Sequence, residues 1–160
     1  MIALVIGGSG SGKSAYAEQM AVKAAGSGSL FYVATMQVYD EEGKKKVERH
    51  QKMRAGKGFL TIEQPRRLKE AAKKVATEKV SAERVPAGKI VLLECMSNLV
   101  ANEMFSEENL SAVMDEAKVK QLSHEIISGV TALQNSCDIL IIVTNQIFED
   151  GIRYDAFTMD

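Results

Sequence analysis

The residues with the clearest chemical meaning lie near the start of the chain, in the sequence Gly7-Gly8-Ser9-Gly10-Ser11-Gly12-Lys13-Ser14. This spacing matches the P-loop, in which consecutive backbone N–H groups turn inward around phosphates. Lys13 would reach the β- and γ-phosphates, and the Ser14 hydroxyl would coordinate Mg²⁺. A chance match is disfavoured because a strand pattern precedes the loop and a helical pattern follows it. The loop therefore predicts binding of a purine nucleoside triphosphate with Mg²⁺.

Two further residues could act on phosphate. Glu94 ends an apolar run, so its carboxylate is expected at the carboxyl tip of a buried strand, where it would hold Mg²⁺ or accept a proton. His50 lies on a charged segment, where a histidine is usually a solvated surface residue. A neutral imidazole is nevertheless a competent nucleophile toward phosphorus, and the residues alone leave both interpretations open. His124 has no comparable neighbours and is interpreted as structural.

The elements that must position these residues alternate between strand and helix patterns. Apolar runs predict buried strands at 1–6, 30–34, 90–93 and 139–143, and a short run at 59–62 could add another. Helices are expected at 13–25, 41–54 (solvent-exposed), 68–79, 97–105 and, after Ser106 as N-cap, from 107 to about 134. Strands that are apolar throughout and separated by helices indicate a parallel sheet covered on both faces. The predicted fold class is α/β, a P-loop NTPase-like three-layer sandwich with a mostly parallel central sheet.

Length and composition restrict the organisation of the chain. The 160 residues are 46% apolar, which predicts a single nucleotide-binding domain over 1–160. A net charge of −1 gives no reason to expect nucleic acid as a partner. No signal peptide is recognised, and no apolar run reaches the roughly 18 residues of a membrane span. We expect a cytoplasmic protein in which Cys95 and Cys137 are buried, reduced thiols.

Several short motifs follow one another in a specific order. They are GGSGSGKS at 7–14, YVAT at 32–35, H-x-x-x-R at His50 and Arg54, T-x-E at Thr61 and Glu63, LLEC at 92–95 with Asn102 and Phe105, and VTN at 143–145. In this order and spacing the chain resembles the bifunctional adenosylcobinamide kinase / adenosylcobinamide-phosphate guanylyltransferase family of cobalamin biosynthesis.

The resemblance implies two reactions. The kinase would transfer the γ-phosphate of ATP or GTP to the hydroxyl of the aminopropanol arm of adenosylcobinamide. In the transferase reaction His50 would attack the α-phosphorus of GTP, expel pyrophosphate and carry GMP as a phosphoramidate. The phosphate of adenosylcobinamide phosphate would then displace His50 and yield adenosylcobinamide-GDP. Two successive displacements let one anionic substrate leave before the other attacks.

The resemblance also implies a set of site residues and an assembly. The nucleotide contacts carried over are the P-loop at 7–14, Ala34, Thr35, Met36, Arg54, Glu63 and Glu94, with Mg²⁺ held at Ser14 and Glu94. Gln51, Lys52 and Met53 occupy a stretch that borders the nucleotide, although their identities match the family less closely. A homo-oligomer, a trimer or larger, is implied as well.

Some positions depart from the family, and other functions remain open. Gly10 stands where the family usually has Arg, Phe59 where it has Trp, and 146–151 where it has E-V-G-x-G. The family continues through another helix and strand, so the C-terminal end is expected to be short. The alternatives are another P-loop small-molecule kinase, in which His50 is a surface residue, and a catalytically degenerate nucleotide-binding module. A regulatory GTPase is disfavoured, because TNQI at 144–147 is not the guanine-reading Asn-Lys-x-Asp.

Overall fold

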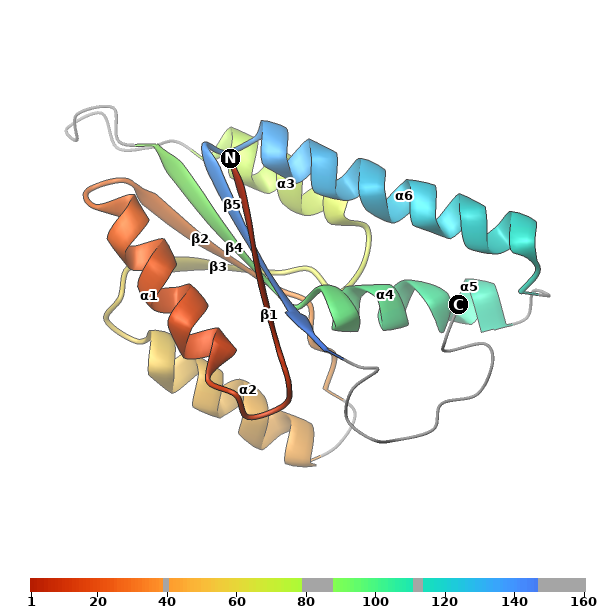
Figure 1. The fold of residues 1–160 in the computed structure, drawn as a ribbon, viewed down its shortest axis with the longest axis horizontal. Coiled ribbons are helices and arrows are strands. Elements are labelled where there is room, and N and C mark those ends of the chain that lie inside the picture. Colours follow the sequence, from red (N-terminus) through yellow and green to blue (C-terminus); the bar gives the residue numbers. More distant parts are fainter. Residues whose placement is uncertain (39–40, 79–87, 111–113, 147–160) are drawn as a thin grey trace.

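The computed structural model describes residues 1–38, 41–78, 88–110 and 114–146. These residues form three layers, with a five-stranded sheet between two layers of helices (Figure 1). The predicted α/β class and the sandwich arrangement are confirmed.

The five strands of the described sheet are all parallel and neighbour one another in the order β1-β5-β4-β2-β3. They are β1 (Ile2–Gly7), β2 (Ser29–Ala34), β3 (Phe59–Glu63), β4 (Lys89–Glu94) and β5 (Ile139–Asn145). In the register, Ala34 is opposite both Glu63 and Glu94. Gly7 is likewise opposite Asn145. The carboxyl ends of all five strands therefore lie at one edge of the sheet, and the short run at 59–62 does form a strand.

Six helices are present in the described part of the chain. They are α1 (Lys13–Ala25), α2 (Glu41–Arg54), α3 (Leu68–Thr77), α4 (Met96–Met104), α5 (Glu107–Leu110) and α6 (Glu116–Asn135). Helices α1 and α2 lie on one side of the sheet and α3 and α6 on the other, while α4 follows the carboxyl end of β4 (Figure 1). None of the described helices has the length and apolar character needed to cross a bilayer.

Alternate residues of each strand serve the two faces of the sheet. In β4, Ile90 and Leu92 pack with the buried alanines of α1, whereas Val91 and Leu93 pack with residues of α3 and α6. Side chains along a strand point to opposite faces in turn, so a strand covered on both sides must be apolar at every position. This requirement explains the continuous apolar runs that predicted the strands.

The single long helix predicted after Ser106 is wrong. Helix α5 ends at Leu110, and α6 begins at Glu116. Asp115 caps the new helix, because its side chain accepts a hydrogen bond of 2.8 Å from the backbone N–H of Lys118. The side chain of Ser106 makes no such cap: its hydroxyl is buried and has no hydrogen-bond partner among the described residues. Asp115 therefore starts a separate helix.

Both cysteines are free, as expected. Cys95 is buried, whereas Cys137 is only half-buried. Burial, together with the charge of Asp138, raises the pKa of Cys137 to about 11, so its thiol stays protonated near neutral pH. Neither cysteine is exposed, whereas a reactive thiol usually is.

Candidate nucleotide-binding site

The P-loop joins β1 to α1, and its shape depends on glycine. Gly10 and Gly12 have φ angles of 72° and 81°, in the left-handed region that favours glycine, and Gly12 is the N-cap of α1. Lys13 lies over the loop, where its Nζ donates a hydrogen bond of 3.0 Å to the carbonyl of Gly8. The loop thus combines a helix N-terminus, backbone donors and an ammonium group, which together suit a phosphate anion.

A carboxylate and a hydroxyl meet where β4 ends and α1 begins. Ser14 Oγ donates a hydrogen bond to Oε1 of Glu94, and the Tyr32 hydroxyl donates to Oε2 of Glu94 at 3.0 Å. Burial and then the negative charge of Glu94 raise the pKa of Tyr32, so this hydroxyl remains a donor at neutral pH. Hydroxyl and carboxylate oxygens are the hard ligands that Mg²⁺ prefers. The chemistry of this donor pair therefore fits the predicted Mg²⁺ site.

The end of α2 turns toward these residues, although the helix was predicted to be solvent-exposed. Most of α2 is exposed, but Arg54 is 7% exposed and His50 is half-buried. The Arg54 guanidinium lies 3.6 Å from the centroid of the Tyr32 ring, in a cation–π contact. Nη1 of Arg54 and Nδ1 of His50 are buried and have no hydrogen-bond partner within the described residues. Leaving such groups unpaired is costly, and an anionic ligand would satisfy the guanidinium.

A cavity of about 490 Å³ at the carboxyl edge of the sheet connects the P-loop with the end of α2. The predicted residues on its walls are Ser9, Gly10, Gly12, Lys13, Ser14, Ala34, Met36, His50, Arg54, Glu63 and Glu94. A cavity of this size is typical of small-molecule sites. The loop, the acidic residue and the histidine, predicted from separate parts of the sequence, therefore border one space.

The other predicted residues lie away from the cavity wall. Gly7, Gly8 and Ser11 belong to the P-loop, Gln51 and Lys52 are exposed on α2, and the side chain of Met53 is outside the described part of the structure. Thr35 is buried, and its hydroxyl exchanges two hydrogen bonds of 2.8 Å with the backbone of Cys95. Its role in this structure is to join the ends of β2 and β4.

The sequence prediction missed several residues of the cavity wall. Asn98 lines it from the first turn of α4, and Asn145 lines it from the end of β5. The strand-end rule that identified Glu94 could have identified Asn145. Tyr32 lines it too and opens the YVAT motif, although it was not assigned to the site. Arg49 also lines it, but an arginine within a charged helix carries no distinguishing signal.

The fold is similar to that of a solved structure described as an ATPase domain. The TM-score is 0.50 at 11% sequence identity, over 90% of this chain and 56% of that chain. At so low an identity the likeness concerns the fold alone, and it agrees with the P-loop NTPase-like class predicted from the sequence.

Sequence comparison identifies the family. Residues 3–158 match the family described as cobinamide kinase / cobinamide phosphate guanyltransferase (CobU). The bifunctional adenosylcobalamin biosynthesis proteins CobU of Escherichia coli (strain K12) and Salmonella typhimurium (strain LT2) are 29% and 30% identical to this chain over 150 residues. Each alignment covers 92% of this chain and 76% of the relative. The chain thus belongs to the cobinamide kinase / cobinamide phosphate guanyltransferase family of cobalamin-biosynthesis transferases.

Proposed function

We propose that this chain catalyses two successive reactions, phosphorylation of adenosylcobinamide by ATP or GTP and transfer of GMP from GTP to the phosphorylated product. The observation that carries the proposal is that His50 borders the same cavity as Lys13 and Ser14 of the P-loop. A histidine that served only as a surface residue would have no reason to bury Nδ1 at this place.

In the kinase reaction, the substrate hydroxyl oxygen attacks the γ-phosphorus, and the bond to the β–γ bridging oxygen breaks. The nucleoside diphosphate leaves with the electron pair, and the hydroxyl proton passes to solvent or to Glu94. The P-loop at 7–14 binds the phosphates, and Lys13 swings from the Gly8 carbonyl to the β- and γ-phosphates. Ser14 and Glu94 would hold Mg²⁺, which when bound offsets the phosphate charge.

In the transferase reaction, an imidazole nitrogen of His50 attacks the α-phosphorus of GTP. The N–P bond forms, the bond from the α-phosphorus to the α–β bridging oxygen breaks, and pyrophosphate leaves. A phosphate oxygen of adenosylcobinamide phosphate then attacks the same phosphorus, and the N–P electron pair returns to His50. Arg54 supports this assignment, because its unpartnered Nη1 lies at the cavity and can bind a phosphate oxygen.

The remaining parts of the proposal concern contacts and assembly. We assign Ala34, Met36 and Glu63 to nucleotide contacts at the cavity wall. Thr35 and the stretch 51–53 would contribute at its border. A single domain over 1–160 and a homo-oligomer of three or more chains complete the proposal, and light scattering would test the oligomer.

The first experiment is incubation with α-³²P-GTP and Mg²⁺ without a corrinoid, followed by denaturing gel electrophoresis. We expect acid-labile, base-stable label on the wild type and none on His50→Ala. The matched control is His124→Ala, because His124 is the other histidine of the chain and is exposed on α6. An unlabelled wild type that still binds nucleotide would leave a P-loop small-molecule kinase, tested by transfer of the γ-phosphate. Failure of that transfer as well would leave a nucleotide-binding module.

A further inference from the structure

A buried carboxylate lies beside the cavity and has no part in the reactions described so far. Glu18 is 0% exposed and shares the sheet-facing side of α1 with Ala21 and Ala25. A charge in such apolar surroundings is costly unless it is paired. Lys57, in the segment after α2, donates to Oε2 of Glu18 at 2.7 Å, but Oε1 has no hydrogen-bond partner among the described residues. Oε1 of Glu18 can therefore still accept a hydrogen bond.

The Glu18 carboxylate lies close to the His50 ring and to Glu94. One ligand atom each of Glu18, His50 and Glu94 lie within 4.8 Å of one another. Both oxygens of Glu94 already accept hydrogen bonds, from Ser14 and from Tyr32. Within this group, Oε1 of Glu18 is thus the free acceptor and Nδ1 of His50 the free buried nitrogen.

We propose that Glu18 is a positioning residue for His50, and that its Oε1 accepts a hydrogen bond from Nδ1–H. A hydrogen bond at one imidazole nitrogen fixes the tautomer and so decides which nitrogen keeps its lone pair. With Nδ1 protonated, Nε2 keeps the lone pair that can attack a nucleotide in the cavity. Such contacts are often long without substrate and tighten when it binds.

This inference rests on the proposed transferase reaction and explains how His50 would perform it. When Nε2 forms the bond to the α-phosphorus and pyrophosphate leaves with its electron pair, Nδ1 keeps its hydrogen and the ring becomes positively charged. The carboxylate of Glu18 offsets that charge. Lys57 holds the opposite oxygen, so the carboxylate keeps its orientation. In the second displacement the electron pair returns to Nε2, and the ring is neutral again.

The first test reads the wild-type protein and uses a substitution only to assign the signals. Nitrogen NMR of the wild-type protein, with ¹⁵N-labelled histidine and assignment through His50→Ala, reports the tautomer of the neutral ring. We expect Nδ1–H, although imidazole in water favours the Nε2–H form. An Nε2–H tautomer of His50 overturns the proposal. The spectrum is recorded with a chelator present, so that no metal bound at Ser14 and Glu94 contributes to it.

The second test is single-turnover guanylylation by Glu18→Gln. Glutamine keeps the size of the side chain, but it lacks the charge and can present an N–H to Nδ1. We expect the rate at saturating GTP to fall at least about tenfold, with half-saturation by GTP changed less than about threefold. The His50 spectrum should lose its Nδ1–H preference. The matched control is Glu103→Gln. The Glu103 carboxylate lies outside the cavity wall and accepts a hydrogen bond of 2.6 Å from the backbone N–H of Arg67, so this variant should be guanylylated at the wild-type rate.

The outcomes separate the two proposals. An unlabelled wild type refutes the transferase reaction, whatever the variant does. A labelled wild type with equal rates for Glu18→Gln refutes only the role of Glu18. A Glu18→Gln variant that does not fold leaves the decision to the wild-type spectrum.

Discussion

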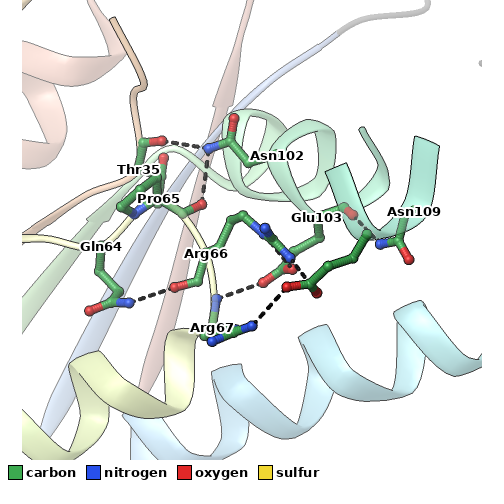
Figure 2. A network of polar contacts seen from close by, with 9 residues as sticks. Thr35, Gln64, Pro65, Arg66, Arg67, Asn102, Glu103 and Asn109 are labelled. Carbon is green, nitrogen blue, oxygen red and sulfur yellow. Dashed lines mark hydrogen bonds and ion pairs between the residues drawn. The ribbon is translucent and has the colours of Figure 1, made fainter. Parts of the chain in front are cut away.

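Two polar clusters near the carboxyl edge of the sheet differ in whether their hydrogen bonds are complete. One, the loop network, ties the segment after β3 to α4 and α5 (Figure 2). It consists of Thr35, Gln64, Pro65, Arg66, Arg67, Asn102, Glu103, Glu108 and Asn109. Within this network the side-chain amide of Asn102 donates two hydrogen bonds, one to the backbone carbonyl of Thr35 at 2.7 Å and one to that of Pro65 at 2.9 Å.

The other cluster, the site cluster, consists of Glu18, His50, Arg54, Lys57 and Glu94 around the cavity. Four buried side-chain polar atoms of the described residues have no partner, and three of them are Glu18 Oε1, His50 Nδ1 and Arg54 Nη1. The fourth, Ser106 Oγ, lies between α4 and α5.

The difference teaches which cluster holds the fold together and which is arranged for a ligand. Buried polar groups are nearly always paired in stable proteins, and unpaired ones cost free energy. A completed network contributes to stability, whereas an incomplete one lowers stability and offers its groups to a substrate. Substitutions in the site cluster should therefore affect activity, and those in the loop network should affect stability.

The largest effect is expected on activity. Lys13→Ala removes the ammonium that would neutralise the β- and γ-phosphates, and we expect both γ-phosphate transfer and His50 labelling to fall by about a hundredfold or more. Its thermal midpoint should stay near that of the wild type, since the ammonium contacts only its own loop in the described structure. Turnover assays and calorimetry on one preparation would check both statements, and substantial residual turnover would contradict the first.

Lys57→Met should be an exception, a substitution in the site cluster that lowers stability. It removes the ion pair that Lys57 forms with Glu18. The Glu18 charge would stay buried without its partner, which we expect to lower the free energy of unfolding by about 2–3 kcal/mol. Urea titration measures this change. The control is Lys44→Met, whose pair with Glu41 is exposed on both sides and should contribute much less. Equal losses in the two variants would show that Glu18 does not depend on Lys57.

Asn109→Ala tests the loop network. Asn109 is 6% exposed, and its side chain donates to the carbonyl of Glu103 at 2.6 Å. Losing this bond should cost about 1–2 kcal/mol of unfolding free energy and leave His50 labelling at the wild-type rate. Asn135→Ala, at the exposed end of α6, is the control for stability. Slower labelling by the Asn109 variant would mean that the two clusters are coupled.

The smallest effect is expected at Arg67, whose φ of 56° lies in the left-handed region. Its ion pair with Glu108 is exposed on both sides and should contribute little. Arg67→Gly relieves the backbone strain and should be more stable than Arg67→Ala by about 0.5–1 kcal/mol. Paired denaturation curves at high and low salt would resolve the two contributions. If the glycine variant is less stable than the alanine variant, the side chain at this position, and not the backbone strain, decides stability.

Much of this molecule could be predicted from local sequence, because strands covered on both faces must be apolar and a phosphate loop needs closely spaced glycines. The P-loop, four of the strands and Glu94 follow from those two rules. The break before α6 does not, because an aspartate within a helical pattern resembles any other exposed charge until its capping bond is seen. Glu18 carries no local signal either, since its burial depends on Lys57 and on the sheet below α1. The burial of Glu18 depends on a contact between residues far apart in the sequence, and the break before α6 depends on one capping bond.

The shared cavity has a consequence for timing. Because the P-loop and His50 border one space of about 490 Å³, two nucleotides would compete for it rather than lie side by side. The proposed phosphorylation and guanylylation would then occur one after the other at one binding site. The nucleotide product of the first reaction would have to dissociate before GTP binds for the second. ATP added in excess should therefore act as a competitive inhibitor of the labelling of His50 by GTP. The cellular ratio of ATP to GTP would then set the overall rate of the two reactions.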